Sequence, residues 1–90
     1  MPDIKTLASE IVLGTNANTV NRASYVRLVN ISNTAHVLIT QKYSNGTTQG
    51  TFTIGHSSSS FSVEYVMKEP DETLQANTAD VILATSIGFY

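Results

Sequence analysis

The sequence predicts an all-β domain, a small antiparallel β-sandwich or barrel of about six to seven strands with an extended N-terminal arm. From Ser24 to Tyr90, apolar and polar residues alternate in short runs, which is the two-residue period of β-strands. Turn residues such as Gly, Asn, Pro and Ser separate these runs about every eight to twelve residues. No helical pattern lies between the runs, so we expect no parallel sheet.

The first two predicted strands of the domain are Ser24–Ile31 and Ala35–Tyr43. Val26 and Leu28 share one face of the first strand, and the other face carries Tyr25, Arg27, Val29 and Ile31. Ser32-Asn33 between the two strands is a tight-turn signal. The pattern therefore predicts that these two strands pair with each other as a hairpin.

The dipeptide Asn45-Gly46 is the strongest hairpin signal in the chain. Both residues tolerate the positive φ angles of a type I′ turn, so we expect the strand that ends at Tyr43 to pair with Thr51–Ile54. In the second of these strands, Phe52 and Ile54 are expected to face the core. The remaining predicted elements are Phe61–Lys68, Glu72–Ala76 (a short strand or a turn) and Ala79–Tyr90.

Residues 1–23 are predicted to be an N-terminal arm or edge strand, and residues 24–90 a single β-domain. Apolar residues near the N-terminus recur at helical spacing, but Gly14 leaves no room for a helix of useful length. Glu10–Leu13 has instead the composition of a strand that ends at Gly14.

The composition indicates a domain that gains stability from contacts with other chains. Its 90 residues form one domain with a thin core, and the chain has no cysteine to form a disulfide. Small chains without disulfides or structural metals often oligomerise. Charged residues are 13% of the chain, about half the usual share, so the surface is polar but mostly uncharged. Such a surface suits packing against other chains, with an ordinary solvated β-surface as the alternative.

The charge distribution argues against nucleic-acid and membrane partners. The net charge is −2, and the five Lys and Arg residues are spread from Lys5 to Lys68 without forming a basic stripe. No apolar run approaches the roughly 20 residues of a membrane helix. The segment Met1–Lys5 lacks the regions of a secretory signal, so we expect a chain that is made and folded in a cytoplasm.

Reactive side chains are few, and none forms a catalytic or metal-binding motif. His36 and His56 are able to approach each other across paired strands, but a third metal ligand is missing. The Gly-x-Ser-x-Gly motif of serine hydrolases is absent. Glu69, Asp71 and Glu72 lack the spacing of a calcium loop and are expected to form a solvated turn. We therefore expect no enzyme activity, no cofactor and no metal site.

The four Tyr and three Phe residues are expected to anchor the core and protein contacts. A stacking platform for single strands or sugars is disfavoured because no arginines are interleaved with these rings. Together with apolar residues of the N-terminal arm, the aromatic residues give the predicted contact residues: Ile4, Leu7, Ile11, Tyr25, Tyr43, Phe89 and Tyr90.

A series of strand and turn motifs between Ser24 and Ile87 resembles one protein family. The motifs include Val-Arg-Leu-Val-Asn, Gly-Thr-Phe-Thr-Ile and Lys-Glu-Pro-Asp-Glu-Thr-Leu, and the whole series occupies residues 26–30, 32–33, 36–39, 50–54, 64, 68–74 and 79–87. They are similar to motifs of small virion structural proteins of marine tailed phages, especially phages of cyanobacteria and their neighbours. Glu72 stands before Thr73 where that family has Asp.

The resemblance implies a particle component, most specifically a capsid decoration or cement protein that stabilises the head by binding across capsid subunits. A tail, neck or fibre-associated module that binds a host surface or glycan is the alternative. The implied partners are the major capsid protein or other virion proteins, and the implied location is the virion, after assembly in the host cytoplasm. The analogy also implies a homo-oligomer, with a trimer expected, in which the segment Met1–Asn21 adds a strand to a neighbour.

Overall fold

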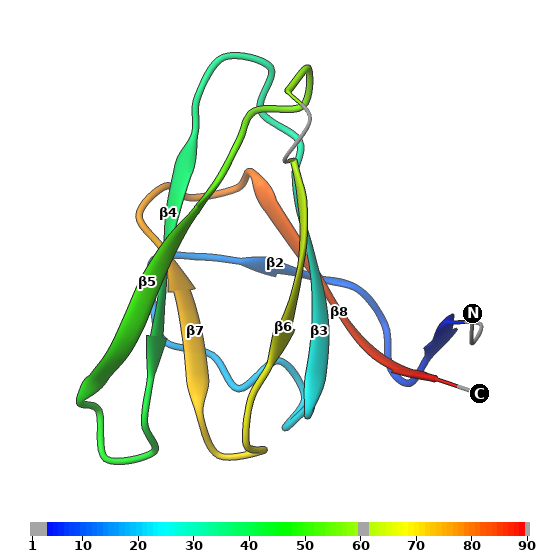
Figure 1. Cartoon of the computed structure of the whole chain (residues 1–90), viewed down its shortest axis with the longest axis vertical. Coiled ribbons are helices and arrows are strands. Elements are labelled where there is room, and N and C mark those ends of the chain that lie inside the picture. Colours follow the sequence, from blue (N-terminus) through cyan, green and yellow to red (C-terminus); the bar gives the residue numbers. More distant parts are fainter. Residues whose placement is uncertain (1–3, 60–61, 90) are drawn as a thin grey trace.

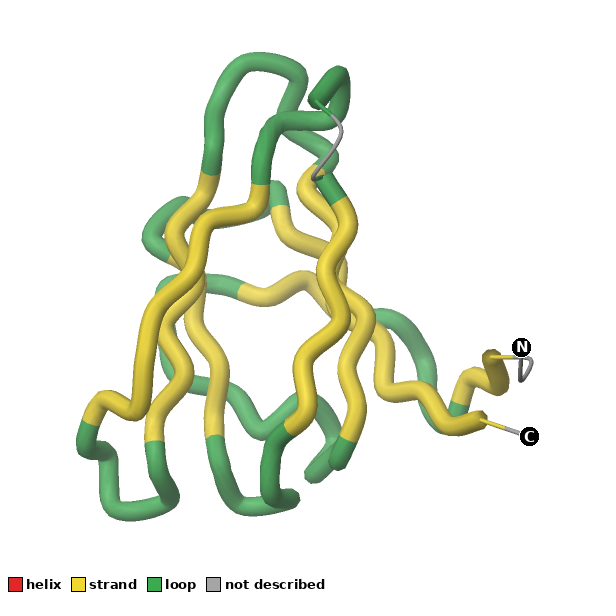
Figure 2. Tube along the Cα trace, in the orientation of Figure 1, coloured by secondary structure: helices red, strands yellow, loops and turns green. Residues whose placement is uncertain are grey.

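A computed structural model, which describes residues 4–59 and 62–89, confirms the all-β fold class. Its strands form two antiparallel sheets, one of five strands and one of three (Figure 1). Figure 2 shows only strands and loops in these residues, and none of them forms a helix with the length and apolar character needed to cross a bilayer. The strands are β1 Ile4–Thr6, β2 Ile11–Leu13, β3 Tyr25–Asn30, β4 Val37–Lys42, β5 Thr48–Ile54, β6 Val63–Met67, β7 Thr73–Ala76 and β8 Ile82–Phe89.

The larger sheet is built around β8, the longest strand. On one side β8 pairs with β3, which in turn pairs with β6 at the edge of the sheet. On the other side the two short strands pair with different parts of β8: β2 with its beginning and β1 with its end. The predicted strand before Gly14 is confirmed as β2.

The smaller sheet has the order β5-β4-β7 and contains the hairpin predicted at Asn45-Gly46. The turn itself differs from the predicted type I′ geometry, because among the loop residues only Gly46 has a positive φ, of 91°. The Gly46 N–H donates to the Tyr43 carbonyl at 2.9 Å, and the Tyr43 N–H donates to the Thr47 carbonyl at 2.8 Å. This pattern is a three-residue loop with glycine in the left-handed position, which also reverses the chain between two strands.

The predicted hairpin between the strands on either side of Ser32-Asn33 is wrong. Strand β3 belongs to the larger sheet and β4 to the smaller sheet, so residues 31–36 cross from one sheet to the other. Both edges of β3 are already paired, with β6 and β8, which leaves no edge for β4. The Ser32 hydroxyl instead accepts hydrogen bonds from the N–H groups of Thr34 and Ala35, and these local bonds stabilise a crossing loop.

The hydrophobic core lies between the two sheets. The alternation predicted for β3 is confirmed, since Val26 and Leu28 are fully buried. The predicted inward face of β5 is also confirmed, since Ile54 is buried and Phe52 packs against the core. The other buried core residues come from both sheets and the loop before β3: Leu13, Val20, Ala23, Val37, Ile39, Val66, Leu74, Ala76, Ile82 and Ala84.

The amide of Asn30 joins the two sheets inside this core. The residue is fully buried at the end of β3. Its Nδ2 donates to the carbonyls of Ala35, at 2.9 Å, and Ile54, at 3.2 Å. Its Oδ1 accepts from the N–H of Ser32 at 2.9 Å. One side chain therefore connects the end of β3, the crossing loop and the end of β5.

The loop before β3 contains a left-handed turn. Val20, Asn21 and Arg22 have φ values of 53°, 57° and 56°, a conformation that costs about 1–2 kcal/mol per non-glycine residue. Complete burial of Val20 offsets part of this cost. The Asn18 Oδ1 accepts from the Val20 N–H at 2.7 Å, and Arg22 forms an ion pair with Asp71.

The substitution Asn30→Ala tests the role of this amide. We expect it to lower the free energy of unfolding by about 2–4 kcal/mol, because one buried carbonyl, one partly buried carbonyl and one N–H lose their partner. Urea denaturation of both proteins measures the difference. The matched control is Asn33→Ala, at an exposed position in the same loop, which is expected to change stability by less than about 0.5 kcal/mol. Equal stability of Asn30→Ala and wild type would contradict the assignment.

Candidate functional site

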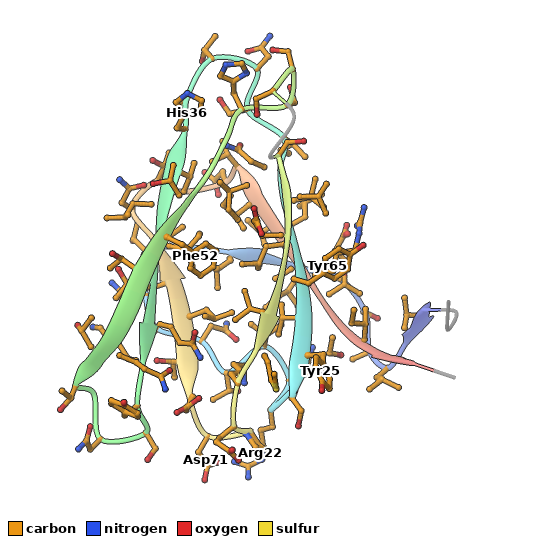
Figure 3. All side chains as sticks on the ribbon, in the orientation of Figure 1. Arg22, Tyr25, His36, Phe52, Tyr65 and Asp71 are labelled. Carbon is orange, nitrogen blue, oxygen red and sulfur yellow. The ribbon has the colours of Figure 1, made fainter. Side chains whose placement is uncertain are left out.

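The most distinctive surface of the molecule is the side of the larger sheet that faces away from the smaller sheet, which we call the outer face. Along β3, the buried Val26, Leu28 and Asn30 alternate with residues that point to this outer face. Figure 3 shows Tyr25 and Tyr65 on the β3–β6 side of the molecule, away from β5. The outer face has no second sheet over it among the described residues.

Aliphatic side chains form a continuous row across this outer face. Val12 of β2 pairs with Leu83 of β8, Leu83 pairs with Val29 of β3, and Val29 pairs with Val63 of β6. Residues that are directly opposite in neighbouring antiparallel strands lie on the same face, so the four side chains are neighbours. Val12 at the end of the row is 51% exposed.

Large exposed side chains extend the row along both directions of the strands. Tyr25 and Met67 are directly opposite each other in β3 and β6, and Met67 is 69% exposed. Tyr65 lies between them and the aliphatic row and is 53% exposed. Ile31 continues the alternation beyond the end of β3 and is 50% exposed. A continuous apolar surface of this kind is unusual for a monomer and is typical of protein contact sites.

Two opposite charges lie within this apolar surface. Arg27 of β3 is half-buried, directly opposite Tyr65 on one side and Thr85 on the other. Glu10 is held beside them, because the Thr85 hydroxyl donates to its Oε2 at 3.2 Å. Arg27, Glu10 and Thr85 line the same hollow. Within residues 4–59 and 62–89, neither Arg27 nor Glu10 forms an ion pair.

A second candidate is the polar groove between the free edges of the two sheets. Its central group is the carboxylate of Glu72, which is 8% exposed. Glu72 accepts hydrogen bonds from the N–H of Glu69 at 2.9 Å, from Gln41 Nε2 at 3.5 Å and from Gln49 Nε2 at 3.4 Å. Gln41 Nε2 also donates to the Met67 carbonyl at 3.3 Å. These hydrogen bonds connect the end of β6 and the turn before β7 to the hairpin formed by β4 and β5.

The carboxylate cluster around Pro70 is only partly the solvated turn that the sequence predicts. The residues do form the turn between β6 and β7, and Glu69 is exposed. The expectation is wrong for Glu72, which is buried among amide donors that satisfy its charge. Asp71 is not an independent carboxylate either, because it is paired with Arg22.

Lys68 is a buried cation beside this groove. It is 5% exposed, and its Nζ donates to the carbonyls of Glu69, at 3.3 Å, and Pro70, at 3.4 Å. Burial lowers the pKa of the Lys68 ammonium below its ordinary value of 10.5. The carboxylates of Glu72 and Asp71 oppose this lowering of the pKa, and Arg22 adds to it.

The two histidines meet at the end of the smaller sheet. The rings of His36 and His56 are stacked with centroids 4.8 Å apart and planes at 23°. The backbone N–H of His56 donates to His36 Nδ1 at 3.2 Å, and the Ser58 hydroxyl lies 2.9 Å from His56 Nδ1. In the described part of the chain, no three His, Cys, Asp or Glu side chains come together as a metal site would require.

The predicted contact residues occupy different places. Tyr25 lies on the outer face. Leu7 is 60% exposed and packs over Gly88, whereas Ile11 packs against the core. Tyr43 is exposed in the loop between β4 and β5, in the other sheet. The side chains of Ile4 and Phe89, and Tyr90 as a whole, lie outside the described residues.

Sequence reasoning missed most of the outer face. Val12, Arg27, Ile31, Tyr65 and Met67 were not among the predicted contact residues. A signal was present in the strand Val63–Met67, where apolar residues occupy both faces. Two apolar faces on one strand indicate that one faces the core and the other faces another surface.

Comparison of the chain with protein-family models, with curated proteins and with solved structures finds no match in any of the three.

The substitution Lys68→Met tests the burial of the cation through the pH dependence of stability. The lowered pKa means that the unfolded state binds more protons than the folded state between that pKa and 10.5. Lys68 therefore contributes a rise in the free energy of unfolding as pH increases through this window. We expect the wild-type value minus the Lys68→Met value to increase with pH in denaturation experiments from about pH 7.5 to 10.5.

The control for the loss of one positive charge is Lys42→Met, in β4. A difference between wild type and Lys68→Met that falls with pH would contradict the assigned direction of the pKa shift.

Proposed function

We propose that this chain is a non-catalytic structural protein of a phage particle, most specifically a capsid decoration or cement protein that binds across capsid subunits. Its partners are the major capsid protein or other virion proteins, and its outer face makes the protein contacts. The observation that carries the proposal is the apolar row Val12–Leu83–Val29–Val63, flanked by exposed Tyr65 and Met67.

The side chains of the outer face are those that protein interfaces use most. Tyrosine, methionine and arginine are enriched at interface centres, and charged residues other than arginine are depleted there. The outer face combines Tyr25, Tyr65 and Met67 with the cation Arg27. A large apolar surface that remained in water would lower the solubility of a chain with only 13% charged residues.

The polar groups elsewhere support a structural role rather than a catalytic one. Glu72 is surrounded by three donors, Asp71 is paired with Arg22, and Lys68 donates to two carbonyls. These hydrogen bonds stabilise the turn between β6 and β7 and attach it to the smaller sheet, which supports a structural role for these groups. The resemblance to virion structural proteins of marine tailed phages agrees with this reading.

Many copies of a small contact protein stabilise a shell efficiently. A copy that touches two capsid subunits at once gains affinity from the second contact, because that contact forms at a high effective concentration. A modest contact area per copy is therefore sufficient.

The alternative is a tail, neck or fibre-associated module that binds a host glycan. One observation favours it: Ser24, Tyr25, Gln41, Gln49 and Glu72 line a single groove, and hydroxyl, amide and carboxylate groups beside an aromatic ring suit a sugar. Isothermal titration calorimetry with host polysaccharide fragments tests it. Binding that is weakened by Gln49→Ala would support the alternative, and no heat at millimolar fragment would reject it.

The first test of the proposed function is mass spectrometry of purified particles. We expect the chain in virions at many copies per particle. Absence from particles, together with abundance in the lysate of infected cells, would reject the proposal.

The second test is binding of purified variants to particles that lack the protein. Tyr65→Ser removes an exposed ring from the outer face and is expected to weaken binding about tenfold or more, the usual effect of losing an interface tyrosine. The matched control is Tyr43→Ser, which removes a ring of similar exposure from the smaller sheet. Equal binding of the two variants would show that the outer face does not contact the particle.

A further inference from the structure

We propose that the free edge of β5 binds an extended segment of another protein, which adds to the smaller sheet as a fourth strand and places a lysine or arginine beside Glu64. This site is separate from the outer face. The inference goes beyond the proposed function, because it holds whether or not the partner belongs to a phage particle. A protein that binds across two subunits also needs a second contact surface, and this edge supplies one.

The backbone groups of β5 that point away from its own sheet are those of Thr51 and Thr53. At the end of β7, the Asn77 N–H donates to the Leu38 carbonyl at 3.0 Å, so the backbone groups of Leu38 point toward β7. Successive residues of an antiparallel strand direct these groups to opposite edges, so the next residue of β4 bonds to Phe52 of β5. The neighbours of Phe52 therefore direct their N–H and C=O groups away from β4. No described strand pairs with this edge.

Strand β5 lacks the protection that two other edges of the fold have. Leu74 of β7 exchanges backbone hydrogen bonds with Asn18, at 2.9 and 3.0 Å, which covers the opposite edge of the smaller sheet. At the β6 edge of the larger sheet, the Met67 carbonyl accepts from the Gln41 side chain. The strand Thr48–Ile54, in contrast, is seven residues long and has neither a charged residue nor a proline. A long edge strand without these devices is a template for pairing with another strand.

A hollow of about 330 Å³ lies beside this edge, between β5 and β6. Phe52 of β5 and Val66 of β6 give its apolar lining. Figure 3 shows Phe52 extending from β5 on the side toward β6. Alternate side chains of a strand added to β5 point to the same side of the sheet as Phe52. These side chains therefore enter the hollow, so we expect the bound segment to alternate apolar inward residues with polar outward ones.

The carboxylate of Glu64 selects the charge of the bound segment. Glu64 is directly opposite Leu28 of β3, and residues that are opposite in neighbouring antiparallel strands lie on the same face. Leu28 is fully buried, so Glu64 lies on the inward face of the larger sheet, where it lines the hollow. It is half-buried and forms no ion pair with another described residue. Partial burial of an unpaired charge is unfavourable, and a basic residue on the added strand supplies the partner.

The same charge argues against a second copy of β5 as the added strand. Two β5 edges are able to pair their backbones, but Thr48–Ile54 contains no lysine or arginine. Pairing of this kind would leave both Glu64 carboxylates beside the interface without a cation. The partner is therefore a segment of different sequence, with a basic residue among its inward positions.

Selection from a library of random heptapeptides, followed by hydrogen exchange, tests the site with the intact chain. We expect the selected peptide to alternate apolar and polar residues, to contain a lysine or arginine, and to saturate wild type below about 1 mM. Its binding is expected to slow amide exchange at Thr51 and Thr53 at least about tenfold, because these N–H groups gain acceptors. Exchange at Phe52, whose N–H already bonds to β4, is expected to change less than about twofold.

Charge variants test the role of Glu64 with the same peptide. Glu64→Gln is expected to weaken binding at least about fivefold, whereas the matched control Glu69→Gln, at an exposed carboxylate, stays within about twofold of wild type. Glu64→Lys is expected to bind a peptide with glutamate in place of the basic residue at least about tenfold more tightly than the original peptide.

Four results would each overturn the inference: no selected binder, a selected peptide without a basic residue, protection confined to strands other than β5, or equal affinity of Glu64→Gln and wild type. Protection of Thr51 and Thr53 that rises with protein concentration in the absence of peptide would also overturn it, because that result assigns the edge to a second copy. Detection of the chain in virions does not depend on these outcomes, so a failure here is distinguishable from a failure of the proposed function.

Discussion

The arrangement of the two sheets depends on the buried amide of Asn30. Its three hydrogen bonds fix the end of β3 against the crossing loop and against the end of β5, so they set how the strands of one sheet lie on the other. Aliphatic contacts alone fix such an alignment weakly, because they are not directional. A buried amide is directional, and any shift that breaks its bonds leaves polar groups unpaired in the core.

At the opposite end of the molecule, amide and charged side chains also form hydrogen bonds between separate elements. Glu72 and Gln41 connect the turn after β6 to β4 and β5 where the two sheets do not share backbone hydrogen bonds. Lys68 is buried nearby at a cost that its neighbouring carbonyls and carboxylates only partly offset. Asn30 at one end and Gln41 at the other therefore each connect the two sheets through a side-chain hydrogen bond.

The sequence predicts the local features of this fold better than its pairing. The alternation at Val26 and Leu28 and the hairpin at Asn45-Gly46 depend on near neighbours, and both are confirmed, although the turn is not the predicted type I′. The wrong hairpin at Ser32-Asn33 arose because a turn signal does not specify which sheet the next strand joins; that depends on β6 and β8, far along the chain. The left-handed turn at Val20 could not be predicted for a similar reason. Valine has no intrinsic preference for positive φ, and burial of its side chain in the finished core stabilises this conformation. The outer face was missed because alternation does not tell which of two apolar faces of a strand is the core.

An apolar sheet face needs charges to become a specific contact. A uniformly aliphatic surface packs against itself at several offsets and angles with similar energy, which favours aggregation over one defined complex. Arg27 and Glu10 disfavour every arrangement that removes them from water without supplying a group of opposite charge. The two charged residues that interrupt the apolar surface therefore limit which surfaces can cover it without a cost in desolvation.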